Sequence, residues 1–510
     1  MSSPISTAKR QEGVCVESER SLDSSLSEND VQFLENFSPQ AQAKTWRKVD
    51  FMIMPTLSIL YLIGHIDRAN IGNAKIEGLE ASLGMTGGDY NVVLSIFFIP
   101  YILAEIPSNY ILYKLKRPSR FLAFLVISWG IVITCTGVVQ SYGGLLACRF
   151  LLGLFEAGFF PGAMHYITLW YPPNKTQTRT AIFYSTAAVS GAFSGLLAAA
   201  ISEMRGLGGY EGWRWIFIVE GLVSVILGIC GFFLLPDTPS LSTKKLAADE
   251  IRFLELTHIS TRGKPTSEGP KMTLGQRWSI IWLILMDFQI YLQALSLMAN
   301  VVPAYGLKFT LPQIMKNMGY TSRNAQLLSA PPYILGAISA LVFGHLGDRL
   351  KWRAPVIAIG QGLLIISYSI QIVYAGHIQD HIALCYFAVF LATAGIYPIA
   401  PGVNAWTVNN LAGQMRRAIG IAFMLTMCNL GGIVGSFMFI DSDKPKYPTG
   451  FGSSLAFSAS GLLSTALLFV SYWYINRRRS RLSPVEVRGK FSEEDLGRLG
   501  DKSPLFRYHL

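Results

Sequence analysis

The sequence predicts an all-α integral membrane protein with twelve transmembrane helices in two pseudo-symmetric six-helix halves. Three observations predict this fold class: a composition that is 51% hydrophobic and only 15% charged over 510 residues, a series of long apolar segments, and an internal repeat. Soluble domains carry roughly 25% charged residues, so this chain has too few charges to cover a water-facing surface. The composition therefore excludes a soluble enzyme and a disordered scaffold.

Twelve segments have the length and apolar character of a spanning helix, which needs about 20 residues. They lie near 50–69, 91–113, 120–140, 145–168, 180–202, 215–236, 279–301, 325–346, 354–374, 382–404, 417–440 and 451–475. These segments predict five regions: a flexible N-terminal tail (1–49), a six-helix bundle (50–236), a central loop (237–278), a second bundle (279–475) and a C-terminal tail (476–510), also expected to be flexible. The central loop is expected to hold a short amphipathic helix near 248–257.

Basic residues predict the orientation. The 43 Lys and Arg residues fall in short clusters between apolar runs, whereas a nucleic-acid binder would gather them into a patch. About twice as many of them lie in loops on the side of both chain ends as in loops on the other side, to which Lys308 and Lys316 are assigned. We therefore expect cytoplasmic termini and a multi-pass monomer in the plasma membrane. Its surroundings would be the lipid bilayer, with no nucleic-acid partner.

An offset of 237 residues relates the two halves. It places Ala157 on Ala394 and Pro161 on Pro398, and it holds across two helices and their loop. Two parallel six-helix repeats are the organisation of major facilitator transporters, which bind substrate at the bilayer midplane between the halves. The repeat therefore predicts that fold and a central site.

A loop signature follows the eighth predicted span. The run from Gly344 to Arg353 resembles the facilitator pattern G-x-x-x-D-R-x-x-x-R, with Asp348 and Arg349 at its centre, whereas the equivalent stretch at 108–120 lacks the acidic residue. Asp348, Arg349 and Arg353 are predicted to bridge cytoplasmic helix ends and so to gate the transport cycle.

The degenerate first copy of this signature resembles the anion:cation symporter family, in particular its fungal allantoate, nicotinate and pantothenate permease branch. Stretches at 67–75, 90–101 and 149–162 carry further similarity, which covers about 45–475. The resemblance implies proton-coupled uptake of a small anion.

Four of the ionisable residues in the N-terminal spans, where each costs on the order of 2.5–3.5 kcal/mol, can be compared with the second half: Asp67, Arg68, Arg149 and Glu156. At the offset of 237, the corresponding residues of the second half are uncharged: Ala304, Tyr305, Tyr386 and Thr393. The shared fold therefore does not require these charges.

Two cavity arginines, with no matching lysine or histidine in the second half, predict an anionic substrate, because an Arg fork pairs bidentately with a carboxylate. Glu156 follows Arg149 by seven residues and so shares its helix face. Protonation of Glu156 would release Arg149 for the substrate. A structural brace at Arg149 and a permanent ion pair remain as alternatives.

The resemblance assigns roles to these charges: Arg68 and Arg149 bind or gate the substrate carboxylate, while Asp67 and Glu156 carry protons.

Four further polar residues are candidates. The resemblance implies that Tyr101 and Asn429 contact the substrate, and Asn404 is a second amide that the C-terminal half could offer, although an asparagine in a span can equally join helices. Glu105 lies one helical turn after Tyr101 and is either a second proton site or a hydrogen-bonding partner of a neighbouring helix.

The sequence thus predicts a secondary active transporter rather than an enzyme. It would import a small organic anion, a monocarboxylate such as nicotinate or a related vitamin or ureide acid, by alternating access with the proton as coupling ion. No P-loop or zinc spacing occurs, so no cofactor or metal is expected. Two alternatives are a secondary-metabolite exporter of the same fold and a transport-dead nutrient receptor.

Overall fold

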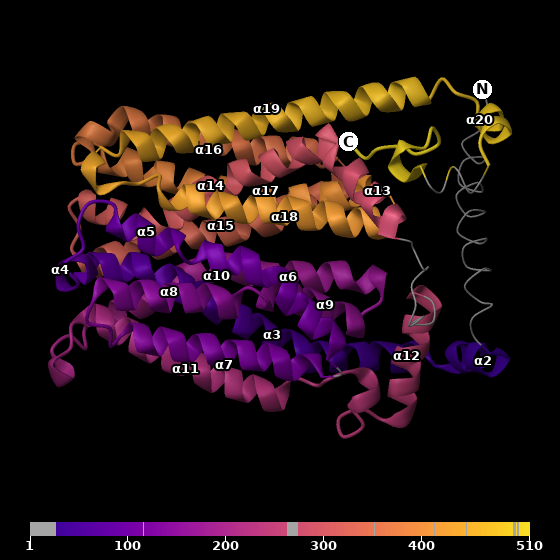
Figure 1. Ribbon diagram of the computed structural model, residues 1–510, viewed down its shortest axis with the longest axis horizontal. Helices are drawn as coiled ribbons and strands as arrows, with labels where there is room; N and C mark the ends of the chain where they lie inside the picture. The colour runs from indigo at the N-terminus through magenta and orange to yellow at the C-terminus, as the bar shows by residue number, and fades with distance from the viewer. Residues whose placement is uncertain are drawn as a thin grey trace.

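The computed structural model is a bundle of long helices that lie roughly side by side (Figure 1). It describes residues 27–262 and 274–510, apart from Lys116, Lys351, Gly413, Pro445, 493–495 and 497–498. The described residues contain 12 helices long and apolar enough to cross a membrane, which confirms the predicted fold class.

Each half contributes six spans, and two spans of the first half are interrupted, so that α5 with α6 and α8 with α9 each form one. The N-terminal spans are α3 (Pro39–Ile76), α5 (Asp89–Ser95) with α6 (Phe98–Lys114), α7 (Pro118–Thr136), α8 (Tyr142–Glu156) with α9 (Phe159–Trp170), α10 (Pro173–Ser202) and α11 (Gly212–Leu234). The C-terminal spans are α14 (Phe288–Asn317), α15 (Ser322–Leu350), α16 (Ala354–Tyr374), α17 (Ile382–Asn410), α18 (Gln414–Ser436) and α19 (Pro448–Arg479).

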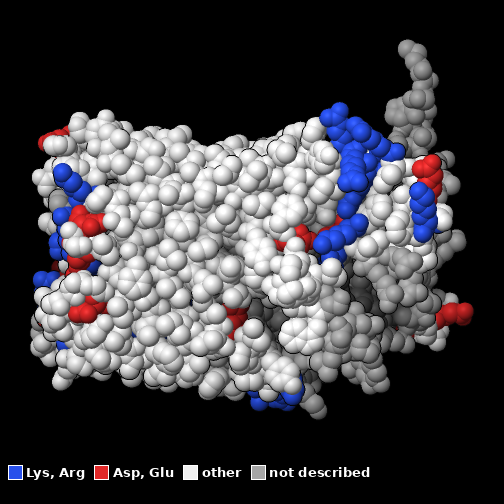
Figure 2. Space-filling view, turned by 45° about the horizontal axis from the view of Figure 1, so that its top comes forward, with Lys and Arg blue, Asp and Glu red and all other residues white. Residues whose placement is uncertain are grey.

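Most of the middle of the molecule's surface is uncharged on the face shown in Figure 2. Lys, Arg, Asp and Glu side chains gather there mainly toward the two ends, and the broad region between them is interrupted by a small acidic patch and a small basic patch along its lower part. Within this chain Phe51, Ile106 and Phe233 are between 70% and 74% exposed. Contact of such apolar side chains with lipid chains costs no free energy, whereas their contact with water does. The protein is therefore a multi-pass membrane protein.

The two ends of the bundle differ in what they carry (Figure 1). One end, called here the tail end, holds α2 (Glu28–Asn36), α12 (Ala248–Arg262) and α20 (Pro484–Lys490), and α12 corresponds to the helix expected in the central loop. The opposite end, called the loop end, holds α4 (Leu79–Ser82) and η4 (Asp441–Asp443). That the tail end faces the cytoplasm stays a prediction.

The seventh span begins and ends later than the predicted 279–301. A separate helix, α13 (Leu274–Leu285), precedes it, and the Asp287 side chain caps α14 by accepting a hydrogen bond from the Gln289 backbone N–H at 3.2 Å. The predicted span therefore includes apolar residues that belong to α13.

The assignment of Lys308 and Lys316 to a loop is wrong, because α14 continues to Asn317. Both ammonium groups turn toward the N-terminal half rather than toward lipid. Lys308 Nζ lies 3.2 Å from His65 Nδ1, and Lys316 Nζ donates to the Ile76 carbonyl oxygen at 3.0 Å. These contacts stabilise two lysines within a span that is otherwise uncharged.

Helices α3 and α14 cross at the centre of the molecule. Arg68 Nη1 donates to the Tyr305 hydroxyl at 2.8 Å, and a Cβ on Gly72 would lie only 2.7 Å from the Phe309 carbonyl oxygen. In both contacts the partners are 237 residues apart, which is the offset that relates the two halves. A residue that touches its own repeat equivalent lies close to the pseudo-two-fold axis, so Arg68 is near that axis.

The tail-end boundaries also differ from those predicted, since α3 starts before residue 50 and α19 ends after residue 475. The C-terminal residues 500–510 pack against the tail ends of the C-terminal helices. Arg416 pairs with Asp501 at 2.6 Å, and the His509 backbone N–H donates to Asn410 Oδ1 at 2.7 Å. This segment is therefore docked, in contrast to the flexible tail expected there.

Candidate functional site

A cavity of about 200 Å³ lies between the two halves. Helices of both halves line it, including α3, α6 and α10 from the first and α14, α17 and α18 from the second. Its wall contains six tyrosines: Tyr61, Tyr101, Tyr184, Tyr305, Tyr333 and Tyr397. Its ionisable lining residues besides these are His65, Arg68, Glu105, Glu156 and Lys308, together with the thiol of Cys428. The volume suits a small organic molecule, and the lining offers both cations and carboxylates to it.

Arg68 holds the central ion pair of this cavity. Its Nε and Nη2 both donate to Glu156 Oε1, the Nε contact being 3.1 Å long, while Nη1 reaches Tyr305 of the opposite half. The rings of Phe97 and Tyr101 lie 4.9 and 5.1 Å from the guanidinium carbon. Glu156 Oε2 has no hydrogen-bond partner among the described residues. One guanidinium thus joins both halves and a carboxylate.

Arg149 lies outside the cavity lining. It is buried in α8, with its guanidinium carbon 5.8 Å from the centre of the Phe217 ring, and its Nε and Nη2 find no hydrogen-bond partner in the described part of the chain. The expected pair between Arg149 and Glu156 is not formed, because Glu156 turns to Arg68 instead. A role for Arg149 in binding the substrate stays a prediction.

Asp67 points away from the cavity into the N-terminal half. Its Oδ2 accepts hydrogen bonds from Trp129 Nε1 at 3.2 Å and from Ser224 Oγ at 2.6 Å. Asn70, one turn further along α3, donates to the Glu220 carboxylate. Trp129 itself lines the cavity, so the indole connects Asp67 to it. A proton-carrying role for Asp67 stays a prediction.

The other predicted polar residues of the spans do meet at the cavity. Tyr101, Glu105, Asn404 and Asn429 all line it. Asn429 Nδ2 donates to Glu105 Oε2 at 3.1 Å, which makes a further polar link between the halves. Glu105 is therefore a hydrogen-bonding partner of a helix in the other half, and its proton role stays a prediction.

Sequence reasoning missed the contribution of α14. The expectation that the second half offers no lysine or histidine to the cavity is wrong, because Lys308 lines it. The repeat identifies Tyr305 only as the uncharged equivalent of Arg68, whereas in the structure Tyr305 contacts that residue. Lys308 follows Tyr305 by three residues, so extending the helical pattern past residue 301 would have placed both side chains on one face.

The predicted gating residues lie at the tail end. Arg349 is exposed in the last turn of α15, and the Arg353 backbone N–H donates to the Leu510 carbonyl oxygen at 2.9 Å. The side chain of Asp348 lies outside the described residues. A latch formed by this signature stays a prediction.

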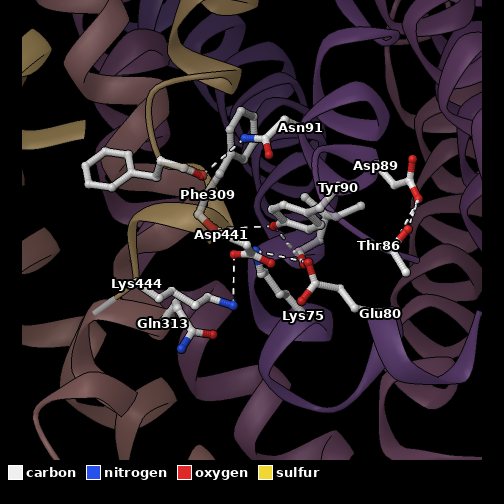
Figure 3. A network of polar contacts seen from close by, with 12 residues as sticks. Lys75, Glu80, Thr86, Asp89, Tyr90, Asn91, Phe309, Gln313, Asp441 and Lys444 are labelled. Atoms are coloured by element: carbon white, nitrogen blue, oxygen red, sulfur yellow. Dashed lines mark hydrogen bonds and ion pairs between the residues drawn. The ribbon is translucent and has the colours of Figure 1, made fainter. Parts of the chain in front are cut away.

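A second polar cluster joins the halves at the loop end (Figure 3). Lys75 Nζ lies between Asp441 Oδ1 at 2.9 Å and Glu80 Oε1 at 3.1 Å, and 3.9 Å from the centre of the Tyr90 ring. Lys444 also pairs with Asp441 at 2.8 Å. Because Asp441 belongs to the C-terminal half, this cluster holds the loop end closed.

Asn91 reinforces the closure. Its Nδ2 donates to the carbonyl oxygens of Ser436 and Phe439 at 2.6 and 3.1 Å, and the Tyr90 hydroxyl lies 3.5 Å from the Phe309 carbonyl oxygen. At the loop end, the halves are therefore joined by these contacts of α5 as well as by the crossing of α3 and α14.

Twelve spans in two related halves, with a polar cavity between them, define a membrane transporter. The chain belongs to the Major Facilitator Superfamily, whose family model matches residues 57–436. This is a family of transporters rather than enzymes.

Relatives and solved structures agree with that assignment. The chain is 35% identical over 484 residues to the MFS-type transporter cnsO of Penicillium expansum, covering 94% of this chain and 92% of that protein. It is 34% identical over 480 residues to an uncharacterized transporter of Schizosaccharomyces pombe, covering 92% and 91%. A D-xylose-proton symporter structure matches with a TM-score of 0.62 at 14% identity, over 82% of this chain and 97% of that one. The last similarity shows the fold alone.

Proposed function

We propose that the protein is a proton-coupled symporter that imports a small organic anion, a monocarboxylate such as nicotinate or a related vitamin or ureide acid. The proposal includes membership of the anion:cation symporter family, residence in the plasma membrane and a cytoplasmic tail end. The observation that supports it best is the Arg68–Glu156 pair inside the cavity between the halves.

The pair offers a route to coupling because a substrate carboxylate and the Glu156 carboxylate compete for one guanidinium. Arg68 holds Glu156 through the single oxygen Oε1, whereas an arginine fork can pair with both oxygens of a substrate carboxylate. When Glu156 takes up a proton it loses its negative charge, and Arg68 becomes available to the substrate. When Glu156 releases the proton it recaptures Arg68 and displaces the anion.

The position of Arg68 links this exchange to the movement of the halves. Its third donor, Nη1, bonds Tyr305 of the C-terminal half near the pseudo-two-fold axis. Alternating access in this fold is largely a rocking of one half against the other around a central site. When Arg68 exchanges Glu156 for the substrate, the change therefore occurs at a contact between the two halves and can alter how they rock against each other.

The experiment is radiolabelled uptake of nicotinate, pantothenate, biotin and allantoate into proteoliposomes, with and without an inward proton gradient. The wild-type protein should accumulate one acid only with the gradient. Arg68→Gln should abolish that accumulation, and Glu156→Gln should retain exchange of the acid but lose uphill accumulation.

Arg481→Gln is the matched control, because its side chain is exposed and lies just after α19, away from the cavity and from the contacts between the halves. It should transport as the wild type does. Gradient-independent movement by the wild type, or release of preloaded acid against an opposing gradient with no uptake, would refute symport and favour the exporter.

A further inference from the structure

We infer that Lys308 is a second substrate anchor, so that the transported anion is held between Arg68 of the N-terminal half and Lys308 of the C-terminal half. This inference deepens the proposed function and rests on it. The sequence predicts only asparagine side chains as substrate contacts from the second half, so Lys308 is an addition to that prediction.

Lys308 is the cation of the cavity that lacks a counter-ion. The ion pairs of the described residues give Arg68 its Glu156, whereas no carboxylate lies within ion-pair distance of Lys308. Among the described residues, the hydrogen-bonding partner of its ammonium is His65 Nδ1, at 3.2 Å. An ammonium inside a span is costly unless it faces a water-filled cavity or an opposite charge, so an incoming anion would be stabilised here.

The contact with His65 is one that a ligand could replace. A lysine ammonium only donates, so His65 Nδ1 must accept and the imidazole must be neutral while this bond lasts. A bond from an ammonium to a neutral nitrogen is weaker than a bond to a carboxylate, because both partners are charged in the latter. Lys308 would therefore exchange His65 for a substrate carboxylate.

The two cations share one region of the cavity. Lys308 lies three residues after Tyr305 on α14, and His65 lies three residues before Arg68 on α3, so each pair occupies one helical turn. The contacts Arg68–Tyr305 and His65–Lys308 both join these two turns. An anion between them would contact both halves, which a substrate held by Arg68 alone would not.

The walls around this point are aromatic. Tyr61 stacks on Phe183 with ring centroids 4.3 Å apart and meets the His65 ring edge-on at 4.6 Å, and Tyr184 and Tyr397 also line the cavity. Flat rings pack favourably with other aromatic faces and edges. A cavity of about 200 Å³ with these walls and two cations fits a compact aromatic or heteroaromatic monocarboxylate.

The test is equilibrium binding of radiolabelled nicotinate and benzoate to the purified protein, with nicotinamide and benzamide as neutral competitors. The wild type should bind at least one acid, and the matching amide should not displace it. Lys308→Gln should weaken acid binding about ten- to hundredfold, the range for losing one charged hydrogen bond. Lys308→Arg should bind the acid more tightly than Lys308→Gln does, since the positive charge is kept.

Two controls separate an anchor from a structural residue. Lys446→Gln removes an exposed lysine at the loop end and should bind the acid as the wild type does. His65→Leu removes the internal partner of Lys308 and should tighten acid binding, because the ammonium then gives up no partner to the acid, whereas a structural pair would be damaged equally by loss of either member. The melting temperature of each variant shows whether it has folded.

Unchanged acid binding by Lys308→Gln overturns this inference and leaves the proposed symport standing. Equal losses in Lys308→Gln and His65→Leu overturn it too, in favour of a structural pair. If the wild type neither binds nor accumulates any acid in either experiment, the proposed function itself fails and the inference fails with it.

Discussion

The close approach of α3 and α14 makes Gly72 a sensitive point of the loop-end closure. In Gly72→Ala the new Cβ would lie 2.7 Å from the Phe309 carbonyl oxygen and 3.3 Å from its carbonyl carbon. Cβ atoms essentially never come within 3.0 Å of another heavy atom, and ordinary contact begins at 3.4 Å. The crossing would therefore have to widen by about 0.7 Å, because a helix carbonyl cannot rotate away as a flexible side chain does.

The magnitude follows from the cost of inserting a methyl group into a tightly packed contact, about 1–3 kcal/mol. The strain exists only while the loop end is closed, so it shifts the equilibrium toward the state in which that end is open. A free energy of this size changes the ratio of the two states by about 5- to 150-fold.

The assay is a spin-label distance measurement between Leu207 and His377, which are exposed on opposite halves at the loop end. The labels are attached in a background without native cysteines. Gly72→Ala should add a population of longer distances. Gly88→Ala is the control, because a Cβ there meets nothing within 4 Å. A distance distribution identical to that of the unsubstituted background, in a variant that melts normally, would refute the argument.

Three further outcomes test the two ends of the bundle. Lys75→Met removes the charged hydrogen bonds to Asp441 and Glu80, so we expect the equilibrium between closed and open loop ends to shift toward the open state by about 1.5–3 kcal/mol. The same spin-label measurement should then show longer distances, and an unchanged distance would contradict the cross-half role of Lys75. Burial raises the pKa of Asp441, but hydrogen bonds from Lys444 and Lys75 outweigh burial and hold the pKa below its usual value of 3.8. The ionised Asp441 carboxylate therefore stabilises the closed loop end above pH 3.8, and this stabilisation is lost as the pH falls through the lowered pKa. The spin-label distances should lengthen over that acid range in the wild type, whereas Asp441→Asn should show no such transition. At the tail end, Arg416→Ala leaves the Asp501 carboxylate buried without its partner, which should cost about 3–5 kcal/mol and accelerate hydrogen exchange at the His509 amide more than Asp501→Asn does.

The fold could be predicted from the sequence because long apolar segments carry a strong signal. The boundaries of α14 could not, since the apolar run at 279–285 belongs to α13 and the polar residues after 301 turn toward the other half. A hydropathy pattern describes what faces lipid, and it assigns a polar, protein-facing turn of a span to a loop. Lys308 was misplaced for this reason.

The site was predicted in part. Arg68, Tyr101, Glu105, Glu156, Asn404 and Asn429 do meet at the cavity. The partner of Glu156 could not be predicted, because helical spacing relates residues within one helix and favoured Arg149, whereas the observed partner comes from another helix. Such a choice depends on how α3 and α8 pack, which spacing along one chain does not encode.

The contacts at the pseudo-two-fold axis bear on how a duplicated protein acquires a single site. In a dimer of two identical chains, a residue on the symmetry axis faces its own copy, so an arginine at the position of Arg68 would face a second arginine. Here both copies belong to one covalent chain and have diverged, so that the guanidinium of Arg68 faces the hydroxyl of Tyr305 and Gly72 makes room for the carbonyl of Phe309. Divergence within one covalent chain thus allows a donor and an acceptor to face each other at the axis, an arrangement that two identical chains could not form there.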